Sequence, residues 1–265
     1  MRREMSVNGT FYPARAVEIE RYFEHFNAVL DEENITLPAV HAKAVIVPHA
    51  GYIYSGFSAN AAYRVLAQSG LSNLLVIGPS HRVALEGASL CEAQSYETPL
   101  GDISFAQELH EALAARFGLS RTIIHAEHST EVQFPFIKHY MPHAKITEII
   151  YGRTSPAYLS EIIDFALSLK DTGVIISTDL SHFYTQEEAN KLDSICLHAI
   201  ESLDISLLHR GCEACGILGV EAIISSAKKH SLSPHLLDYR TSADASGDTS
   251  RVVGYVSACF SQENA

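Results

Sequence analysis

Long apolar runs are absent from the 265-residue sequence, and no segment approaches the roughly 20 residues needed to cross a bilayer. The N-terminal stretch MRREMSVNGTFYP has basic residues with no apolar run behind them, so we expect neither a signal peptide nor an anchor. Basic residues are also scarce: 19 Lys and Arg stand against 31 Asp and Glu, for a net charge of −12. Because a nucleic-acid surface needs a basic stripe, we expect no nucleic-acid partner, no membrane partner and a cytoplasmic location.

Cysteine is sparse and scattered, at five positions: Cys91, Cys196, Cys212, Cys215 and Cys259. This odd number does not form the disulfide framework of a small secreted domain. Cys212 and Cys215 make a lone C-x-x-C, which without a second closely spaced Cys or His pair does not predict a zinc knuckle. We interpret the pair as two small residues at the start of a helix, with a redox dithiol as the alternative.

No linker or low-complexity segment divides the chain, which predicts one domain over residues 1–265. Continuous apolar runs of strand length alternate with segments of helical periodicity. The expected strands include residues 42–48, 73–80, 144–152 and 173–182, and the expected helices include residues 58–70, 104–116 and 155–170. A proline inside residues 130–142 predicts a kinked or broken helix. The alternation is typical of an α/β fold with a mostly parallel sheet flanked by helices.

Fourteen histidines are present, and three of them end predicted strands. His49 ends the run VIVPH, and His81 ends the run LLVIGPSH. The run VIISTDLSH ends in His182 and also contains Asp179. Ligands of a parallel sheet bind outside the carboxyl ends of its strands, so these side chains are expected in one crevice. One such histidine alone is better explained as a hydrogen-bonded loop residue, but three with an aspartate favour a functional site.

Several histidines beside a carboxylate indicate a metal site, because neutral imidazole and carboxylate are both metal ligands. Two histidines and one carboxylate with open coordination positions fit non-haem Fe(II), whereas three histidines alone fit zinc or copper. A further histidine that does not bind the metal would act as a general acid or base near neutral pH.

The segment HAEHSTEVQFPF, which begins at residue 125, is dense in histidine and glutamate. Ser129, with an acidic or amide residue in the following turn, predicts a helix N-cap. The cap does not explain the density of histidine and glutamate before it, so we also expect hydrogen bonds from this segment to orient the metal ligands. A tyrosine close to the first strand-end histidine either lines the same pocket or packs in the core. The residues expected to support the ligands are Glu127, His128, Glu131 and Tyr52.

Six segments occur in a specific order: VPHAGYIYSG, GPSH, ETPLGDI, EHSTEVQFPF, STDLSHF and SGDTSRVVGYVS. Together they resemble the MEMO family, AmmeMemoRadiSam system protein B, and the resemblance runs from NGTFYP to the last expected strand. It implies a MEMO-like domain whose fold is similar to that of the class III, LigB-type extradiol dioxygenases. Those enzymes cleave catechols with non-haem Fe(II).

The resemblance also implies roles for particular residues. His49 and His81 match the two histidine ligands of the family. His182 matches a third histidine of the same pocket, which is the candidate acid/base catalyst. Asp179 belongs to that pocket and is assigned to catalysis with His182.

The third metal ligand is where the sequence departs from the family. The animal member has a cysteine near its C-terminus, but the comparable stretch LLDYRTSADASGD contains none. Asp244 lies closest to that position, with Asp248 as the alternative, while Cys215 matches a different family cysteine. A carboxylate in place of a thiolate favours Fe(II), with copper or zinc as alternatives.

The resemblance implies a dioxygenase-like oxidoreductase that uses O₂ on an unidentified small molecule. The alternative is a non-catalytic adaptor that binds a peptide in the same crevice, as MEMO proteins are described to bind phosphotyrosine peptides. A phosphate reader needs arginines beside its pocket, and only Arg82 and Arg240 lie near the motif segments, which favours the metal protein. The resemblance adds an AMMECR-domain protein and a radical S-adenosylmethionine enzyme as pathway partners.

Overall fold

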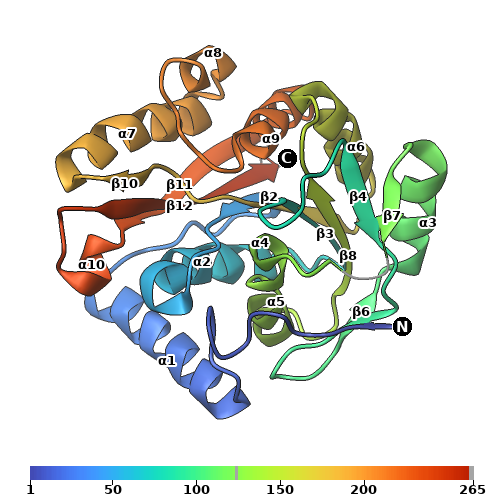
Figure 1. Ribbon diagram of the computed structural model, residues 1–265, viewed down its shortest axis with the longest axis horizontal. Helices are drawn as coiled ribbons and strands as arrows, with labels where there is room; N and C mark the ends of the chain where they lie inside the picture. The colour runs from blue at the N-terminus through green and yellow to red at the C-terminus, as the bar shows by residue number, and fades with distance from the viewer. Residues whose placement is uncertain (123–124, 263–265) are drawn as a thin grey trace.

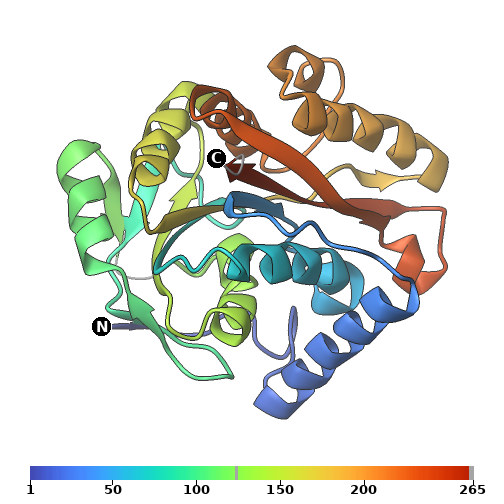
Figure 2. The same ribbon diagram turned by 180° about the vertical axis from the view of Figure 1, so that it is seen from behind.

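A sheet of twelve strands runs through the residues that the computed structural model describes, 1–122 and 125–262. Its order is β1-β5-β6-β8-β3-β9-β2-β12-β10, with β11 paired to β12 and β4 paired to β7 and β8. The strands are β1 (Arg2–Arg3), β2 (Ala42–Val47), β3 (Asn73–Pro79), β4 (Ala88–Cys91), β5 (Ser95–Tyr96), β6 (Ile103–Phe105), β7 (Ser120–Thr122), β8 (Lys145–Tyr151), β9 (Thr172–Ser177), β10 (His182–Tyr184), β11 (Leu232–Thr241) and β12 (Val252–Gln262). Helices cover both faces of this sheet (Figure 1, Figure 2).

The centre of the sheet is parallel, which confirms the predicted fold class. β6, β8, β3, β9 and β2 all run in the same direction. Because β9 lies between β3 and β2, with Val47 opposite Ser177, the carboxyl ends of these three strands lie side by side. Antiparallel pairs complete the sheet: β12 with β2, β11 with β12, and β4 with β8. The two strands that His49 and His81 follow therefore end at the same edge.

Two layers of helices bury the faces of the sheet. The helices are α1 (Ala16–Glu32), α2 (Tyr52–Ala67), α3 (Gln107–Arg116), α4 (His128–Glu131), α5 (Phe134–Tyr140), α6 (Pro156–Ser168), α7 (Gln186–Ser202), α8 (Ile205–Leu208), α9 (Ile217–Lys229) and α10 (Ala243–Ser246). α1, α2 and α5 lie on one face, and α6 and α9 lie on the other (Figure 1, Figure 2). Side chains of β2 alternate between the two layers, with Ile46 in one apolar cluster and Val45 and Val47 in the other. Each such fully buried side chain contributes about 2 kcal/mol, so the strand ends that carry the site are rigid.

Two helices begin at positions that differ from the prediction. α2 begins at Tyr52 rather than at residue 58, so YIYSG forms its first turn. Gly56 permits this helix to pack on α1, because a Cβ atom there would lie 2.6 Å from Cζ of Phe26. Residues 103–105 form β6, and α3 begins only at Gln107. The break expected within residues 130–142 is confirmed by the separate helices α4 and α5. Within the described ranges, no helix combines the length and the apolar character that crossing a membrane requires.

Candidate metal centre

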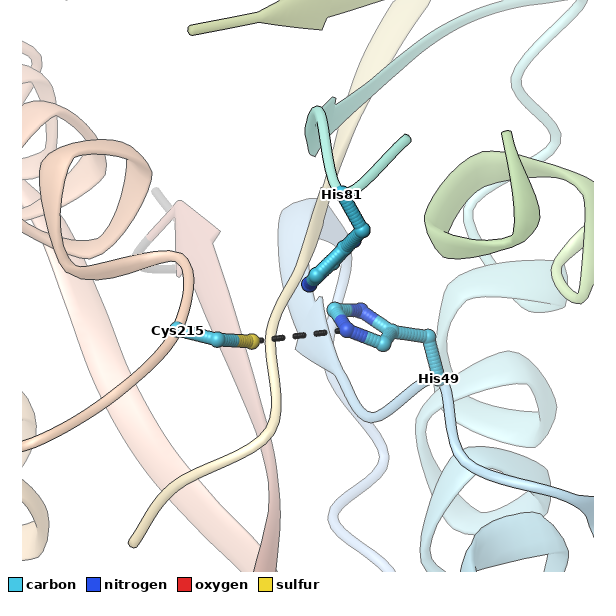
Figure 3. Close-up of side chains that lie close together, drawn as sticks. All are labelled: His49, His81 and Cys215. Carbon is cyan, nitrogen blue, oxygen red and sulfur yellow. Dashed lines mark hydrogen bonds between the residues drawn. The ribbon is translucent and has the colours of Figure 1, made fainter. Parts of the chain in front are cut away.

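Two of the strand-end histidines meet a cysteine at the carboxyl edge of the sheet. His49 follows β2, His81 follows β3, and Cys215 lies just before α9. The Nε2 atom of His49 lies 3.4 Å from the Sγ atom of Cys215. One potential ligand atom from each of the three residues lies within 4.8 Å of the other two. Figure 3 shows the two imidazole rings and the thiol directed toward a common space.

The geometry of these three side chains fits a transition-metal ion. Metal–nitrogen bonds of about 2.1 Å and metal–sulfur bonds of about 2.3 Å place the two donor atoms of a tetrahedral site roughly 3.6 Å apart. The 3.4 Å between His49 Nε2 and Cys215 Sγ is close to that spacing. Imidazole nitrogen and thiolate sulfur are ligands for zinc, copper and iron. The residues present therefore fit a bound ion of this class.

A chain of hydrogen bonds sets the tautomer of His49. Ser177 donates its hydroxyl proton to the carbonyl oxygen of Ser129 at 2.5 Å, so its own oxygen accepts from Nδ1 of His49 at 2.9 Å. Gln133 donates to the same hydroxyl oxygen at 3.0 Å. Nδ1 of His49 thus carries the proton, and Nε2 presents its lone pair to the site. Burial lowers the pKa of His49 to about 4, which keeps the ring neutral at pH 7.

Glu127 orients two imidazole rings at once. Its Oε1 atom accepts from Nδ1 of His81 at 3.1 Å and lies 3.0 Å from Nδ1 of His128. The carboxylate also accepts from the backbone N–H groups of His81 at 2.7 Å and of Ser129 at 3.1 Å. Burial alone would raise the pKa of Glu127, but the hydrogen bonds from His128 and His81 outweigh it and hold the pKa well below its usual range. Since Nδ1 of each ring faces an ionised carboxylate, Nε2 of each ring is left for the site.

The N-cap of α4 is Glu127 rather than the predicted Ser129. The helix begins at His128, and the side chain of Glu127 accepts the N–H of Ser129. The hydroxyl of Ser129 instead donates to the carbonyl oxygen of Pro79, at the end of β3, at 2.8 Å. Glutamate reaches the same backbone group that a shorter cap would, and here it also reaches the two rings. One carboxylate therefore starts the helix and orients the histidines.

Cys215 is held closely against the end of β9. Its backbone N–H donates to the carbonyl oxygen of Asp179 at 3.1 Å, and the N–H of Asp179 donates to its sulfur at 3.3 Å. Gly216 allows this approach, because a Cβ atom there would lie 2.8 Å from Cβ of Thr178 and 2.9 Å from the carbonyl oxygen of Ser177. Burial, with the Asp179 carboxylate, raises the pKa of the Cys215 thiol to about 12, so the metal-free thiol keeps its proton at neutral pH.

Asp179 lies beside the three candidate ligands. Its Oδ1 atom accepts from the backbone N–H of His49 at 2.8 Å, and its Oδ2 atom lies 3.9 Å from Nε2 of the same residue. The residue is buried, with 5% of its surface exposed. A carboxylate at this place can hold a proton for the centre or add an oxygen ligand to it.

The structure places Cys215, rather than Asp244 or Asp248, beside the two histidines. Asp244 is exposed, and its carboxylate accepts from the backbone N–H of Thr241 at 2.8 Å. Asp248 is also exposed and accepts from the backbone N–H of Ser250 at 2.9 Å. Each carboxylate satisfies the backbone of its own turn, which is a common use of aspartate in loops. In the part of the chain that the structure describes, neither belongs to a group of potential metal ligands.

His182 lies in the edge strand β10, which pairs with β12. Its ring contacts that of Phe183, with 5.7 Å between centroids. β9 ends at Ser177, five residues before His182, and no group of potential metal ligands among the described residues includes His182. The ring that packs beside the ligand pair is that of His128, whose centroid is 4.5 Å from that of His81 and 5.4 Å from that of His49. From the sequence, His128 is expected only to support the ligands, and nothing in the sequence indicates that it, rather than His182, lies beside them.

The other two residues expected to support the ligands contact the core. Tyr52 is buried and donates its hydroxyl proton to the carbonyl oxygen of Val132 at 3.0 Å. Glu131 is fully buried and accepts from Arg3 at 2.5 Å and from the hydroxyl of Tyr12 at 2.8 Å. Both residues therefore stabilise α4 through core contacts, and Glu131 connects this helix to the N-terminal segment through Arg3 and Tyr12.

A second group of potential metal ligands, Cys91, His125 and Glu148, is fully buried. The guanidinium of Arg3 lies beside this group, with Nε 3.3 Å from Oε2 of Glu148. Burial alone would raise the pKa of Glu148, but Arg3 and then His125 outweigh it and lower the pKa to about 2. Because the guanidinium of Arg3 pairs with both Glu148 and Glu131, we interpret the group as part of a structural ion-pair network.

The disulfide of the structure does not join the two cysteines of the C-x-x-C motif. Cys212 forms a disulfide with Cys196 of α7, and Cys215 keeps a free thiol. The redox dithiol of Cys212 and Cys215 is therefore wrong. A signal for Cys215 lies in the topology: α9 precedes β11, which runs parallel to β2, so the start of α9 lies at the carboxyl edge of the sheet. That signal requires the direction of β11, which the sequence does not state.

Comparison with known proteins identifies the family. Residues 3–259 match the family model described as Memo-like protein. A MEMO1 family protein of Methanothermobacter thermautotrophicus is 35% identical over 278 residues, which cover 96% of this chain and 99% of the relative. MEMO1 family proteins of Thermoplasma acidophilum and Aquifex aeolicus are each 31% identical over 97% of this chain and 98% of their own.

Among solved structures, an uncharacterized protein from Escherichia coli K12 matches with a TM-score of 0.52 and 11% identity, over 81% of this chain and 98% of that one. At this identity the likeness shows a shared fold alone. The family model and the relatives together cover nearly the whole chain, and the chain therefore belongs to the Memo-like protein family.

Proposed function

We propose that this protein is a metal-dependent, dioxygenase-like oxidoreductase that acts with O₂ on a small organic molecule. The observation that carries the proposal is the meeting of His49, His81 and Cys215 at the carboxyl edge of the sheet. His81 keeps 31% of its side chain exposed, so a small molecule can reach the group from solvent. A bound redox-active ion would supply the electron transfer to O₂ that no side chain of the site can provide.

Iron(II) or copper is the ion that this function requires. The two-histidine, one-carboxylate set expected with Asp244 favours iron(II). Cys215 replaces that carboxylate with a softer sulfur ligand, which raises the affinity for copper relative to iron(II). Zinc fits the same ligands but has no redox chemistry. Native zinc would therefore overturn the assignment as an oxidoreductase while leaving the metal site intact.

His128 and Asp179 are the residues placed to move a proton beside this centre. Nδ1 of His128 faces Glu127 at 3.0 Å, which leaves Nε2 to exchange a proton with a substrate. We assign to His128 the acid/base role that the resemblance implies for His182, because the ring of His128 packs against that of His81. Asp179 holds the backbone of His49 and keeps its second oxygen toward the site.

The adaptor alternative finds less support. Arg240, one of the two arginines near the motif segments, pairs with Glu33 at 3.0 Å and with Asp238 at 3.3 Å. Its guanidinium also lies 3.8 Å from the centre of the Phe57 ring. An arginine engaged in this way is not free to bind a peptide phosphate. The AMMECR-domain protein and the radical S-adenosylmethionine enzyme remain predicted pathway partners.

Metal analysis of anaerobically purified protein tests this function. We expect one iron or copper ion per chain, and O₂ uptake when the loaded protein meets its substrate. Replacing His49 and His81 together by alanine should remove the ion, whereas His198→Ala, an exposed histidine of α7, should retain it. Unchanged metal content in the double variant would refute the site.

A further inference from the structure

The disulfide lies in the same loop as the candidate metal ligand. Cys196, in α7, is fully buried and bonds to Cys212, which is 7% exposed. Three residues after Cys212, the sulfur of Cys215 lies 3.4 Å from Nε2 of His49. The bond therefore ties α7 to residues 209–216, the segment that brings Cys215 to the centre.

Before Cys215 this segment is attached by the disulfide, by the hydrogen bond that the Cys212 N–H donates to the carbonyl oxygen of Leu208 at 3.1 Å, by the buried Ala214, and by His209, whose Nε2 lies 3.3 Å from Oε2 of Glu221. Residues 209–216 lie between α8 and α9 and form neither helix nor strand. Gly211 has a φ of +133°, a conformation that other residues rarely adopt, so the chain makes a sharp bend directly before the disulfide. At the far end, Cys215 and Gly216 donate backbone hydrogen bonds to Asp179 and Thr178. The disulfide fixes one end of the segment and the end of β9 fixes the other.

We propose that Cys196 and Cys212 form a redox site that is coupled to metal binding at Cys215; this inference rests on the metal centre of the proposed function. The reaction is thiol–disulfide exchange with a dithiol reductant. A thiolate of the reductant attacks Cys212, the more exposed partner, and Cys196 leaves and takes up a proton. The second thiol of the reductant then releases Cys212 as a thiol. The protein gains two electrons and two protons, and the dithiol becomes a disulfide.

The coupling follows from the ordering of the loop. With the disulfide closed, residues 209–216 are held in place, and metal binding does not have to order them. With the disulfide open, the loop gains conformational freedom, and the metal must offset that entropy when Cys215 binds. We expect the reduced protein to bind metal roughly tenfold more weakly. By reciprocity, bound metal makes the disulfide harder to reduce by the same factor.

Cobalt(II) titration tests the coupling, because its thiolate charge-transfer absorption reports the bond to Cys215. The oxidised wild-type protein is compared with the variant Cys196→Ala/Cys212→Ala. Ala199→Gly is the matched control, since it weakens α7 at a buried position without touching the disulfide. We expect roughly tenfold weaker binding with the same absorption band in the double variant, and unchanged binding in the control.

Reduction of the wild-type protein by a phosphine gives the same comparison without substitution, in case the double variant does not fold. Equal affinity of the oxidised and reduced forms would overturn the coupling but leave the metal centre standing. If the oxidised wild-type protein binds no cobalt(II), the metal centre itself fails, and the coupling with it. Peptide mapping after exposure of the metal-free protein to glutathione should find the mixed disulfide on Cys212, and finding it on Cys196 would refute the direction of attack.

Discussion

Replacing Glu127 with glutamine separates the charge of this residue from its shape. Its carboxylate accepts from the ring nitrogens of His81 and His128 and from the backbone N–H groups of His81 and Ser129. All four partners are donors, and they are divided between the two carboxylate oxygens. A glutamine side chain replaces one oxygen with an NH₂ group, which cannot accept. At least one buried donor therefore loses its partner.

The magnitude follows from the cost of that lost partner. An unsatisfied buried donor costs about 1–3 kcal/mol, and the loss of charge-assisted hydrogen bonds adds a similar amount. Glu127 is 2% exposed, so water does not compensate. We expect the free energy of unfolding to fall by about 3 kcal/mol. Metal affinity should fall roughly 10- to 100-fold, because His81 loses the group that orients its ring.

Urea denaturation of the metal-free protein measures the stability, and cobalt(II) titration measures the affinity. Glu187→Gln is the matched control, because Glu187 forms an exposed pair with Lys191 on α7 and has no part in the site. We expect both quantities to be unchanged in this control. Wild-type stability together with wild-type affinity in Glu127→Gln would refute the reasoning.

Three further predictions concern the same region. The free energy of unfolding of the metal-free protein should rise by about 3 kcal/mol between about pH 4 and pH 6.5 because of His49 alone. In this range the unfolded chain binds the proton, with a pKa near 6.5, whereas the buried ring, with a pKa of about 4, does not. Equal pH profiles of the wild-type protein and His49→Gln, measured by urea denaturation, would contradict this. Gly216→Ala should lower the free energy of unfolding by about 1–3 kcal/mol, measured by urea denaturation, and should weaken metal binding. The reason for both effects is that the added Cβ would lie 2.8 Å from Cβ of Thr178. Wild-type metal affinity in this variant would show that the close approach is not needed. Asp244→Ala should leave the metal content, measured by elemental analysis, unchanged, since the carboxylate accepts the backbone N–H of Thr241. Loss of the metal would instead identify Asp244 as a metal ligand.

The parallel centre of the sheet and the meeting of two candidate ligands could be predicted from the sequence. Continuous apolar runs predict buried parallel strands, and the residue that follows such a run must lie at the carboxyl edge of the sheet. His49 and His81 therefore lie at the same edge of the sheet, because each follows a parallel strand. The first residues of the helices were harder to predict. α2, for example, begins within a segment of mixed small and aromatic residues whose packing depends on the ring of Phe26.

The third candidate ligand could not be predicted by the same reasoning. Cys215 is 166 residues from His49 in the chain, and its place depends on the direction of β11 and on the close approach that Gly216 permits. Asp244 offered equally suitable chemistry, but a carboxylate in a turn can satisfy its own backbone, as this one does. Local sequence does not distinguish these two outcomes.

The absorption spectrum of the cobalt(II)-loaded protein tests the central claim most directly. A centre of His49, His81 and Cys215 predicts a thiolate charge-transfer band in the wild-type protein. The band should persist in Asp244→Ala and disappear in Cys215→Ser. A band-free wild-type spectrum, or metal binding that survives in Cys215→Ser and is lost in Asp244→Ala, would contradict the centre described above.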